Sequence, residues 1–248
     1  MLRLRFSILT AAFTGLACVI ILAAPARAET ISDWDFSTYT TSGADWHPSP
    51  LAPFASDSNA TIIGLTRNWT LGSGSAAAYA WGGNNFSTTA NTEALAIAAN
   101  NFVTLSLTAQ PGYTLSLSDI PAYNIRHSAT GPLTGIWQYQ VDSGSFVDIG
   151  GAIAWGSVTT SAGNAEPAID LSGFSDLQNV AAGTTVTLRC VTWGATSTGG
   201  TWYFNEPTSH TTAPDLAVEG NVTVVPEPSA LIVLAMGGLC LLPFVRRK

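Results

Sequence analysis

Carboxylates are the most abundant side chains in this sequence that could act in acid–base catalysis or bind a metal ion. The stretch 29–225 holds fifteen aspartate and glutamate residues against three arginines and no lysine. A glycosidase needs two carboxyl groups about 5–10 Å apart across a sugar site, and nothing in the sequence identifies such a pair. Asp57, Asp119 and Asp142 occur in segments typical of solvated turns. A secreted polysaccharide hydrolase therefore remains an alternative supported only by the available carboxylates.

The patterns that usually mark catalysis are missing. His47, His127 and His210 have unrelated neighbourhoods, without an H-E-x-x-H pattern or a cysteine at metal-ligand spacing. The stretch 195–199 is better explained as a Thr/Ser/Gly loop than as a nucleophile elbow. A lysine-free, acidic stretch cannot neutralise phosphates, which excludes nucleic acid as a partner. We therefore expect a protein that is not an enzyme.

Aromatic and polar side chains offer a different kind of site, one that binds sugars. Trp193 shares a strand face with Arg189, opposite the apolar face of Val186 and Leu188. Sugars stack their C–H faces on aromatic rings, while polar side chains bind their hydroxyl groups. The candidate platform comprises Arg189, Trp193, Trp202, Asn205 and Glu206. The alternative is that loops cover the outer sheet faces and these aromatic residues pack beneath them.

Short segments of alternating polarity must position these side chains. In 102–109, valine and leucine alternate with threonine and serine, which predicts a strand with one dry face. Further strands are predicted at 34–38, 61–66, 113–117, 123–127, 136–141, 145–149, 184–192, 201–204 and 216–225. The stretch 91–100 reads equally well as a helix or a strand. About ten to twelve short strands predict an all-β fold, a two-sheet antiparallel β-sandwich.

The N-terminal segment has the three parts of a secretory signal peptide. A basic start with Arg3 and Arg5 precedes an apolar run over 6–24, and Ala26 and Ala28 stand at the −3 and −1 positions. We expect signal peptidase to remove residues 1–28, although a retained membrane anchor uses the same apolar run. Two of the three cysteines lie in the end segments, so Cys190 has no partner for an internal disulfide and is expected to face the core.

The C-terminal segment, 226–248, also has three parts in a fixed order. Pro226, Glu227 and Pro228 precede an apolar stretch over 230–245, which a basic end follows, formed by Arg246, Arg247 and Lys248. Sixteen helical residues span about 24 Å, somewhat less than a hydrocarbon layer of about 30 Å. The segment is therefore a candidate transmembrane helix whose basic end stays cytoplasmic.

This tail resembles the PEP-CTERM sorting signal of exopolysaccharide-producing Gram-negative bacteria. The resemblance covers about a tenth of the chain and implies recognition and removal by the membrane protease exosortase. It implies an exported protein that is held briefly in the inner membrane and then released to the cell surface or extracellular matrix, in association with exopolysaccharide. A permanent tail anchor is the alternative use of the same helix.

Phrases inside 29–225 resemble the jelly-roll ectodomains that often precede such tails. They lie at 111–117, 181–189, 200–204 and 215–220. The resemblance implies that the last strand, at 216–223, returns beside the first, at 34–38. Jelly rolls often hold a structural Ca²⁺, which favours oxygen ligands. The candidate ligands on these two strands are Asp33, Asp35, Asp215 and Glu219.

Three functional hypotheses follow. The first is an exported, non-enzymatic surface or matrix protein, organised as a signal peptide (1–28), a β-sandwich ectodomain (29–225) and a sorting signal (226–248). The second is a carbohydrate-binding module that uses the aromatic platform. The third is the hydrolase.

Overall fold

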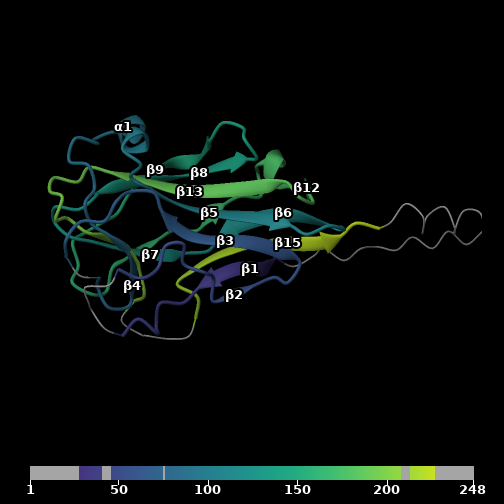
Figure 1. The fold of residues 1–248 in the computed structure, drawn as a ribbon, viewed down its shortest axis with the longest axis horizontal. Coiled ribbons are helices and arrows are strands. Elements are labelled where there is room, and N and C mark those ends of the chain that lie inside the picture. Colours follow the sequence, from purple (N-terminus) through teal and green to yellow (C-terminus); the bar gives the residue numbers. More distant parts are fainter. Residues whose placement is uncertain (1–27, 41–45, 75, 208–212, 227–248) are drawn as a thin grey trace, which may run out of the picture.

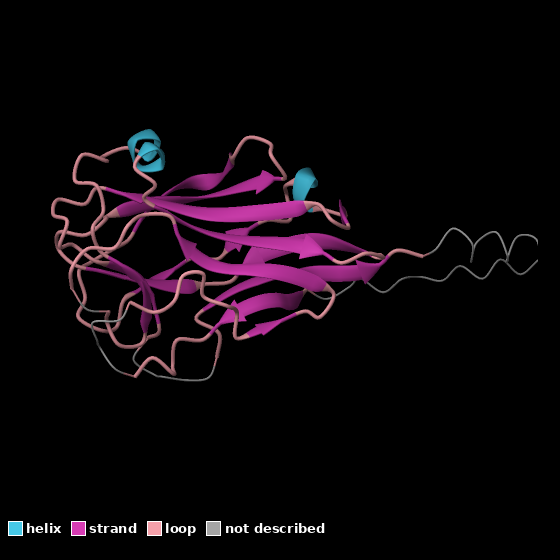
Figure 2. Ribbon diagram, in the orientation of Figure 1, coloured by secondary structure: helices cyan, strands magenta, loops and turns pink. Residues whose placement is uncertain are grey.

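The computed structural model describes residues 28–40, 46–74, 76–207 and 213–226. Within these ranges the chain is all-β, and its sheets are antiparallel. Strands dominate the described part of the chain (Figure 2). The described part holds no helix of the length and apolarity that a membrane crossing needs. The predicted signal peptide (1–28) and C-terminal sorting signal (226–248) lie outside the described residues, apart from Ala28 and Pro226.

A five-stranded sheet forms one layer of the domain. Its order is β3 (Ala60–Arg67), β5 (Phe102–Ala109), β13 (Thr185–Trp193), β8 (Thr134–Val141) and β9 (Val147–Ala154). On β13, Val186, Leu188 and Cys190 face the core with no exposed surface. This confirms the inward orientation predicted for Cys190 from its alternation with Val186 and Leu188.

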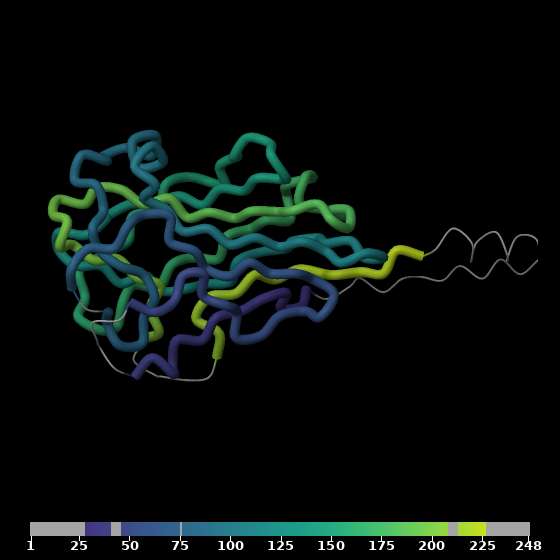
Figure 3. Tube along the Cα trace, viewed as in Figure 1, coloured from purple at the N-terminus to yellow at the C-terminus, as the bar shows by residue number. Residues whose placement is uncertain are grey.

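A six-stranded sheet contains both the first and the last strand. Its order is β11 (Ile169–Asp170), β6 (Tyr113–Ile120), β15 (Leu216–Val224), β1 (Glu29–Trp34) and β2 (Ala55–Ser56), with β12 (Val180–Ala181) also paired to β6. β1 and β15 are antiparallel, and Trp34 lies opposite Leu216. The last strand therefore returns beside the first, as the jelly-roll resemblance implies. Figure 3 shows the two ends of the described chain running next to each other.

A four-stranded sheet completes the fold. Its order is β10 (Asn164–Glu166), β7 (Tyr123–His127), β14 (Trp202–Asn205) and β4 (Ala80–Gly83). β6 and β7 are almost continuous in sequence and are separated only by Pro121 and Ala122. Proline has no N–H to donate to a strand ladder. The chain therefore leaves one sheet at Pro121 and enters another, and three sheets form where the sequence predicted two.

Buried aromatic residues join the five-stranded sheet to the four-stranded sheet. The indole Nε1 of Trp137 on β8 donates to the hydroxyl oxygen of Tyr123 on β7 at 2.9 Å. The ring centroid of Trp137 also lies 6.1 Å from that of Phe204 on β14. All three side chains are buried, and they belong to one continuous apolar cluster that all three sheets share. The core thus lies between the five-stranded sheet and the other two, as in a β-sandwich.

A short helix, α1 (Glu93–Ala98), covers part of the outer face of the five-stranded sheet. Thr92 caps its first turn by accepting from the N–H of Leu95. Asn100 follows in the left-handed region, with φ of 57°, and its N–H donates to Ile97 while that of Asn101 donates to Ala96. This pattern is the Schellman motif that ends many helices. The ambiguous stretch 91–100 therefore contains a helix and not a strand, and Figure 1 shows α1 above β13.

Most predicted strands are confirmed, two of them to the residue. β5 and β7 have the predicted bounds, whereas β1 runs from Glu29 to Trp34 and not over 34–38. Residues 37 and 38 form a turn instead. Strand β4 was missed, because its glycine-rich Ala-Trp-Gly-Gly sequence shows no alternation. Besides α1, the described residues form one 3₁₀ helix, η1 (Ser175–Leu177).

Candidate metal centre

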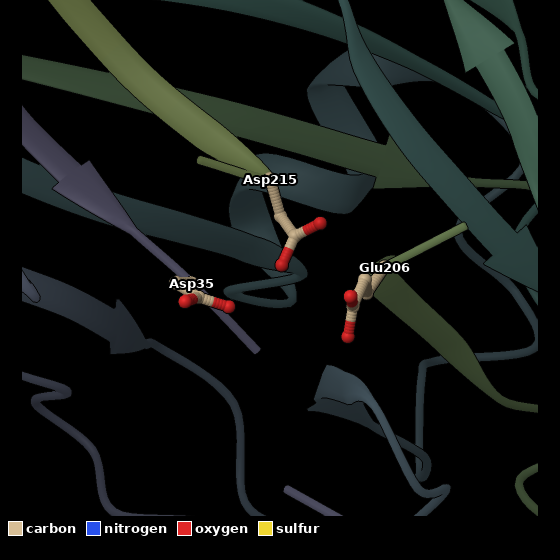
Figure 4. A group of neighbouring side chains, drawn as sticks. All are labelled: Asp35, Glu206 and Asp215. Carbon is tan, nitrogen blue, oxygen red and sulfur yellow. The ribbon is translucent and has the colours of Figure 1, made fainter. Parts of the chain in front are cut away.

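Three carboxylates meet where three strands end. Asp35 directly follows β1, Glu206 directly follows β14, and Asp215 directly precedes β15. One carboxylate oxygen from each lies within 4.8 Å of the others. The exposed fractions of the three residues are 9%, 2% and 8%. Figure 4 shows the three side chains facing a common space from separate segments of the chain. We call this group the carboxylate cluster.

Backbone hydrogen bonds hold the cluster in place. Oδ2 of Asp215 accepts from the N–H of Phe36 at 2.7 Å, and the N–H of Asp215 donates to the carbonyl of Trp34 at 2.9 Å. Oδ1 of Asp35 accepts from the N–H of Ser37 at 2.8 Å. The N–H of Glu206 donates to the carbonyl of Tyr79 at 2.9 Å. The geometry of the cluster is therefore set by the strand ends themselves.

Burial makes the negative charge of the cluster costly. Loss of hydration raises the pKa of Asp215 to about 7, partly offset by its hydrogen bond from Phe36 and increased further by the negative charges of Glu206 and Asp35. Burial also raises the pKa of Asp33, and the charge of Asp35 adds to that effect. The buried negative charge must therefore be relieved, by a proton or by a cation.

The arginines of the domain are committed to other contacts. The stretch 29–225 contains no lysine, and each of its three arginines packs its guanidinium over an aromatic ring: Arg67 over Trp81 at 4.4 Å, Arg126 over Tyr203 at 5.8 Å and Arg189 over Phe146 at 3.5 Å. The charges that shift the pKa of Asp215 are both negative. A cation from solution is one candidate to offset this buried charge, and a proton is the other.

The donor set fits a hard divalent cation. Calcium binds carboxylate and carbonyl oxygens at 2.3–2.6 Å, so two oxygens on one ion lie at most about 5 Å apart. The separation of up to 4.8 Å in the carboxylate cluster meets that limit. Asp35, Glu206 and Asp215 would hold the ion. An ion held there would join the ends of three strands.

Two of the four predicted calcium ligands belong to this cluster. Asp35 and Asp215 come together as expected, whereas Oδ1 of Asp33 accepts from the N–H of Ala55 at 3.0 Å. Glu219 is partly exposed and lies opposite Thr30 in the strand ladder. The prediction that all four form one site was therefore wrong. It missed Glu206, because only the path of β14 brings this residue to the ends of β1 and β15.

The predicted sugar platform does not form, because its residues lie on two sheets. Arg189 and Trp193 lie on β13 of the five-stranded sheet. Trp202 and Asn205 are the first and last residues of β14, and their exposed fractions are 0% and 1%. Glu206 belongs to the carboxylate cluster. A buried indole cannot stack on a sugar.

The other two platform residues are engaged with protein. Arg189 packs over Phe146 and donates to Gln138, whose amide donates in turn to Glu93 at the start of α1. Trp193 packs against the apolar cluster beneath α1. The alternative, in which these aromatic residues pack against protein, holds for Trp193, although the cover comes from helix α1 and leaves Trp193 partly exposed.

The predicted sorting and cleavage residues fall mostly outside the described residues. Ala26, Glu227 and Pro228 are among those outside, as is the basic end formed by Arg246, Arg247 and Lys248. Ala28 and Pro226 are the first and last described residues.

The chain matches no family model, and neither the curated proteins nor the solved structures contain a match to it.

Proposed function

We propose that this chain is an exported, non-enzymatic protein of the cell surface or extracellular matrix, delivered by an exosortase-dependent route and associated with exopolysaccharide. In this proposal the described β domain, a jelly-roll-like sandwich, is the working part. The two end segments serve for delivery and are removed by signal peptidase and exosortase.

The observation that carries the proposal is the relation between β1 and β15. Glu29, the first residue of β1, lies opposite Gly220, and β15 continues only to Val224. Both ends of the domain therefore emerge from neighbouring strands at one end of the molecule (Figure 1). The strand ladders and the apolar cluster of the described residues are formed within 28–226. Removal of both end segments would leave these ladders and this core intact, as the proposal requires.

A divalent cation has a structural role in this proposal. Bound by Asp35, Glu206 and Asp215, it would join the end of the first strand, the start of the last strand and the end of β14. Outside the cell, calcium is available at concentrations that suit extracellular sites of modest affinity. A cation-joined closure suits a protein that lacks an internal disulfide, since Cys190 is the only cysteine of the described residues.

The experiment is a truncation ending at Val225, compared with the full chain in a host that has an exosortase. The truncated chain should be released into the periplasm or the medium, and the full chain should be membrane-associated until it is processed. Pro226→Ala together with Pro228→Ala should retain the unprocessed chain in the membrane. A truncated chain that stays in the membrane would contradict the sorting role of the tail.

A further inference from the structure

A polar cleft lies at the end of the domain away from its first and last residues. It has a volume of about 360 Å³, within the range of small-ligand sites. Its walls come from the segments after β3 and β4, the C-terminal end of α1 and the loop between β13 and β14. A second hollow of about 180 Å³ shares Asn85 and Thr198 with it. The two shared residues are joined by a hydrogen bond from the N–H of Asn85 to the carbonyl of Thr198 at 2.7 Å, so the two hollows adjoin on either side of this contact. We call the two adjoining hollows the asparagine groove.

Amides and hydroxyls dominate the walls of the asparagine groove. Four asparagines line the larger hollow, together with threonine and serine side chains, over two aromatic residues, Trp69 and Phe86. Among the described residues that line either hollow, none is charged. The absence of cationic side chains at these positions disfavours phosphates and carboxylates, which require charge-assisted hydrogen bonds. The many polar groups disfavour an apolar ligand.

The asparagine side chains are held by the protein before any ligand binds. Nδ2 of Asn68 donates to Oγ1 of Thr104 at 3.0 Å, and Nδ2 of Asn85 donates to the carbonyl of Thr70 at 2.8 Å. Because an amide presents both donors and an acceptor, fixing each nitrogen orients its oxygen. The groove is therefore an ordered array of acceptors and hydroxyls, which lowers the entropic cost of binding.

Asn101 supplies an unused donor at the same place. Its Oδ1 accepts from the N–H of Ser87 at 3.4 Å. Its Nδ2 is buried and has no hydrogen-bond partner among the described residues, and the whole residue is 1% exposed. An unsatisfied buried donor costs about 1–3 kcal/mol. Asn101 lines the larger hollow, so a ligand oxygen bound there is a candidate partner for this donor.

Aromatic residues give the groove a rigid floor. The rings of Trp69 and Phe86 lie 4.7 Å apart between centroids, and the indole Nε1 of Trp69 donates to the carbonyl of Asn84 at 2.8 Å. Asn84 in turn holds the neighbouring loop, because it accepts from the N–H of Gly72 and donates to the carbonyl of Ser73. The floor and both walls are thus connected through one pair of adjacent asparagines, Asn84 and Asn85.

We propose that the asparagine groove binds a neutral oligosaccharide. Sugar hydroxyls donate and accept hydrogen bonds, so they match uncharged amides and hydroxyls better than any charged or apolar ligand does. A second polar hollow adjoins the larger one, which favours a short chain of sugars over a single one. This inference goes beyond the delivery role proposed above and does not depend on it.

The test is a glycan array that carries neutral and acidic oligosaccharides, probed with the full chain in mild detergent. We expect binding to neutral glycans, with affinity at least tenfold weaker in Asn100→Gly and in Asn85→Gly. Both residues have positive φ, 57° and 69°, so glycine keeps the backbone conformation and removes only the amide. Asn179→Gly is the matched control, because Asn179 is exposed, has φ of 54° and lies outside the groove.

Three outcomes would overturn the proposal: no neutral glycan bound, binding confined to acidic glycans, or equal affinity in both groove variants and the control. A melting temperature for each variant shows that it is folded. Export and processing are measured separately in cells, so the groove can fail this test while the delivery proposal stands.

Discussion

Oδ2 of Asp215 accepts a hydrogen bond from the backbone N–H of Phe36 at 2.7 Å, which joins residues 179 positions apart in the chain. Phe36 lies just beyond the first strand and Asp215 just before the last. The same carboxyl group belongs to the carboxylate cluster with Asp35 and Glu206. The closure of the domain therefore depends on a buried acidic group, and its stability should respond to whatever neutralises that group.

The first prediction concerns calcium. Free Ca²⁺ at 100 times its Kd should stabilise the folded chain by about 2.7 kcal/mol relative to EGTA, because a ligand that binds only the folded state stabilises it by mass action. Asp215→Asn keeps an acceptor for the N–H of Phe36 and removes the charge. This variant should lose most of the calcium response, as measured by urea unfolding at pH 7.5.

Glu219→Gln is the control for the calcium prediction. Glu219 lies on β15, the strand that Asp215 precedes, but it is not part of the carboxylate cluster. This variant should respond to calcium as the unaltered chain does. An equal response in Asp215→Asn, or no response in the unaltered chain, would remove calcium from the account.

The second prediction concerns pH and Glu166, which lies on β10 and is 5% exposed. Burial raises the pKa of Glu166 from 4.5 to about 7. The folded state therefore holds this proton more tightly than the unfolded state. Its contribution to stability is complete below about pH 4.5 and is lost as the pH rises towards 7.

Comparison with Glu166→Gln measures that contribution. Between pH 4.5 and pH 8 the unaltered chain should lose at most about 3 kcal/mol more unfolding free energy than the variant, at about 1.4 kcal/mol per pKa unit. Urea unfolding in EGTA at several pH values gives both curves. Parallel curves would show that Glu166 has an ordinary pKa in the folded chain.

The third prediction concerns the hydrogen bond between the sheets. Tyr123→Phe removes the acceptor of the Trp137 Nε1–H and leaves that donor buried. The cost should be about 1–3 kcal/mol of unfolding free energy. Tyr139→Phe serves as the comparison, because the hydroxyl of Tyr139 reaches only the exposed Asp176, at 3.4 Å, and it should cost less. Chemical denaturation of the two variants under one condition makes the comparison.

The fourth prediction compares the two tryptophans of the predicted sugar platform, Trp193 and Trp202. Trp202 is fully buried, with ring centroids 5.0 Å from Phe204 and 6.0 Å from Trp155. Trp202→Ala should cost about 3–5 kcal/mol. Trp193 is partly exposed beside α1, so Trp193→Ala should cost clearly less. Similar losses in the two variants would contradict the different burial of these side chains.

Alternation was enough to predict the long strands. β5 alternates between buried and partly exposed residues along its whole length, because one face meets the core, and period-two patterns record that directly. β13 alternates in its first half and is buried on both faces further on, where α1 packs on its outer side. β4 and the two-residue strands show no alternation. β4 has four residues, two of them glycines, and the two-residue strands are too short for a period to be visible. The chain passes from one sheet to another at Pro121, between β6 and β7, and the pairings of β14 with β4 and β7 then form the third sheet, which no single segment predicts.

The candidate site was only partly predictable for a related reason. Asp35 and Asp215 were placed together through the pairing expected between the first and last strands. Glu206 joins them because β14 ends beside them, which depends on its pairing with β4 and β7. The asparagine groove was not predicted at all, since its walls come from four separate segments. Surface sites of this kind arise from topology, which single segments do not encode.

The central claim, a folded domain between two removable delivery segments, is tested most directly by the intact mass of the protein recovered from the cell surface. We predict a chain that begins at Glu29 and lacks the apolar tail and its basic end. Recovery of the complete 25.8 kDa chain from the cytosol, with both end segments in place, would contradict the account.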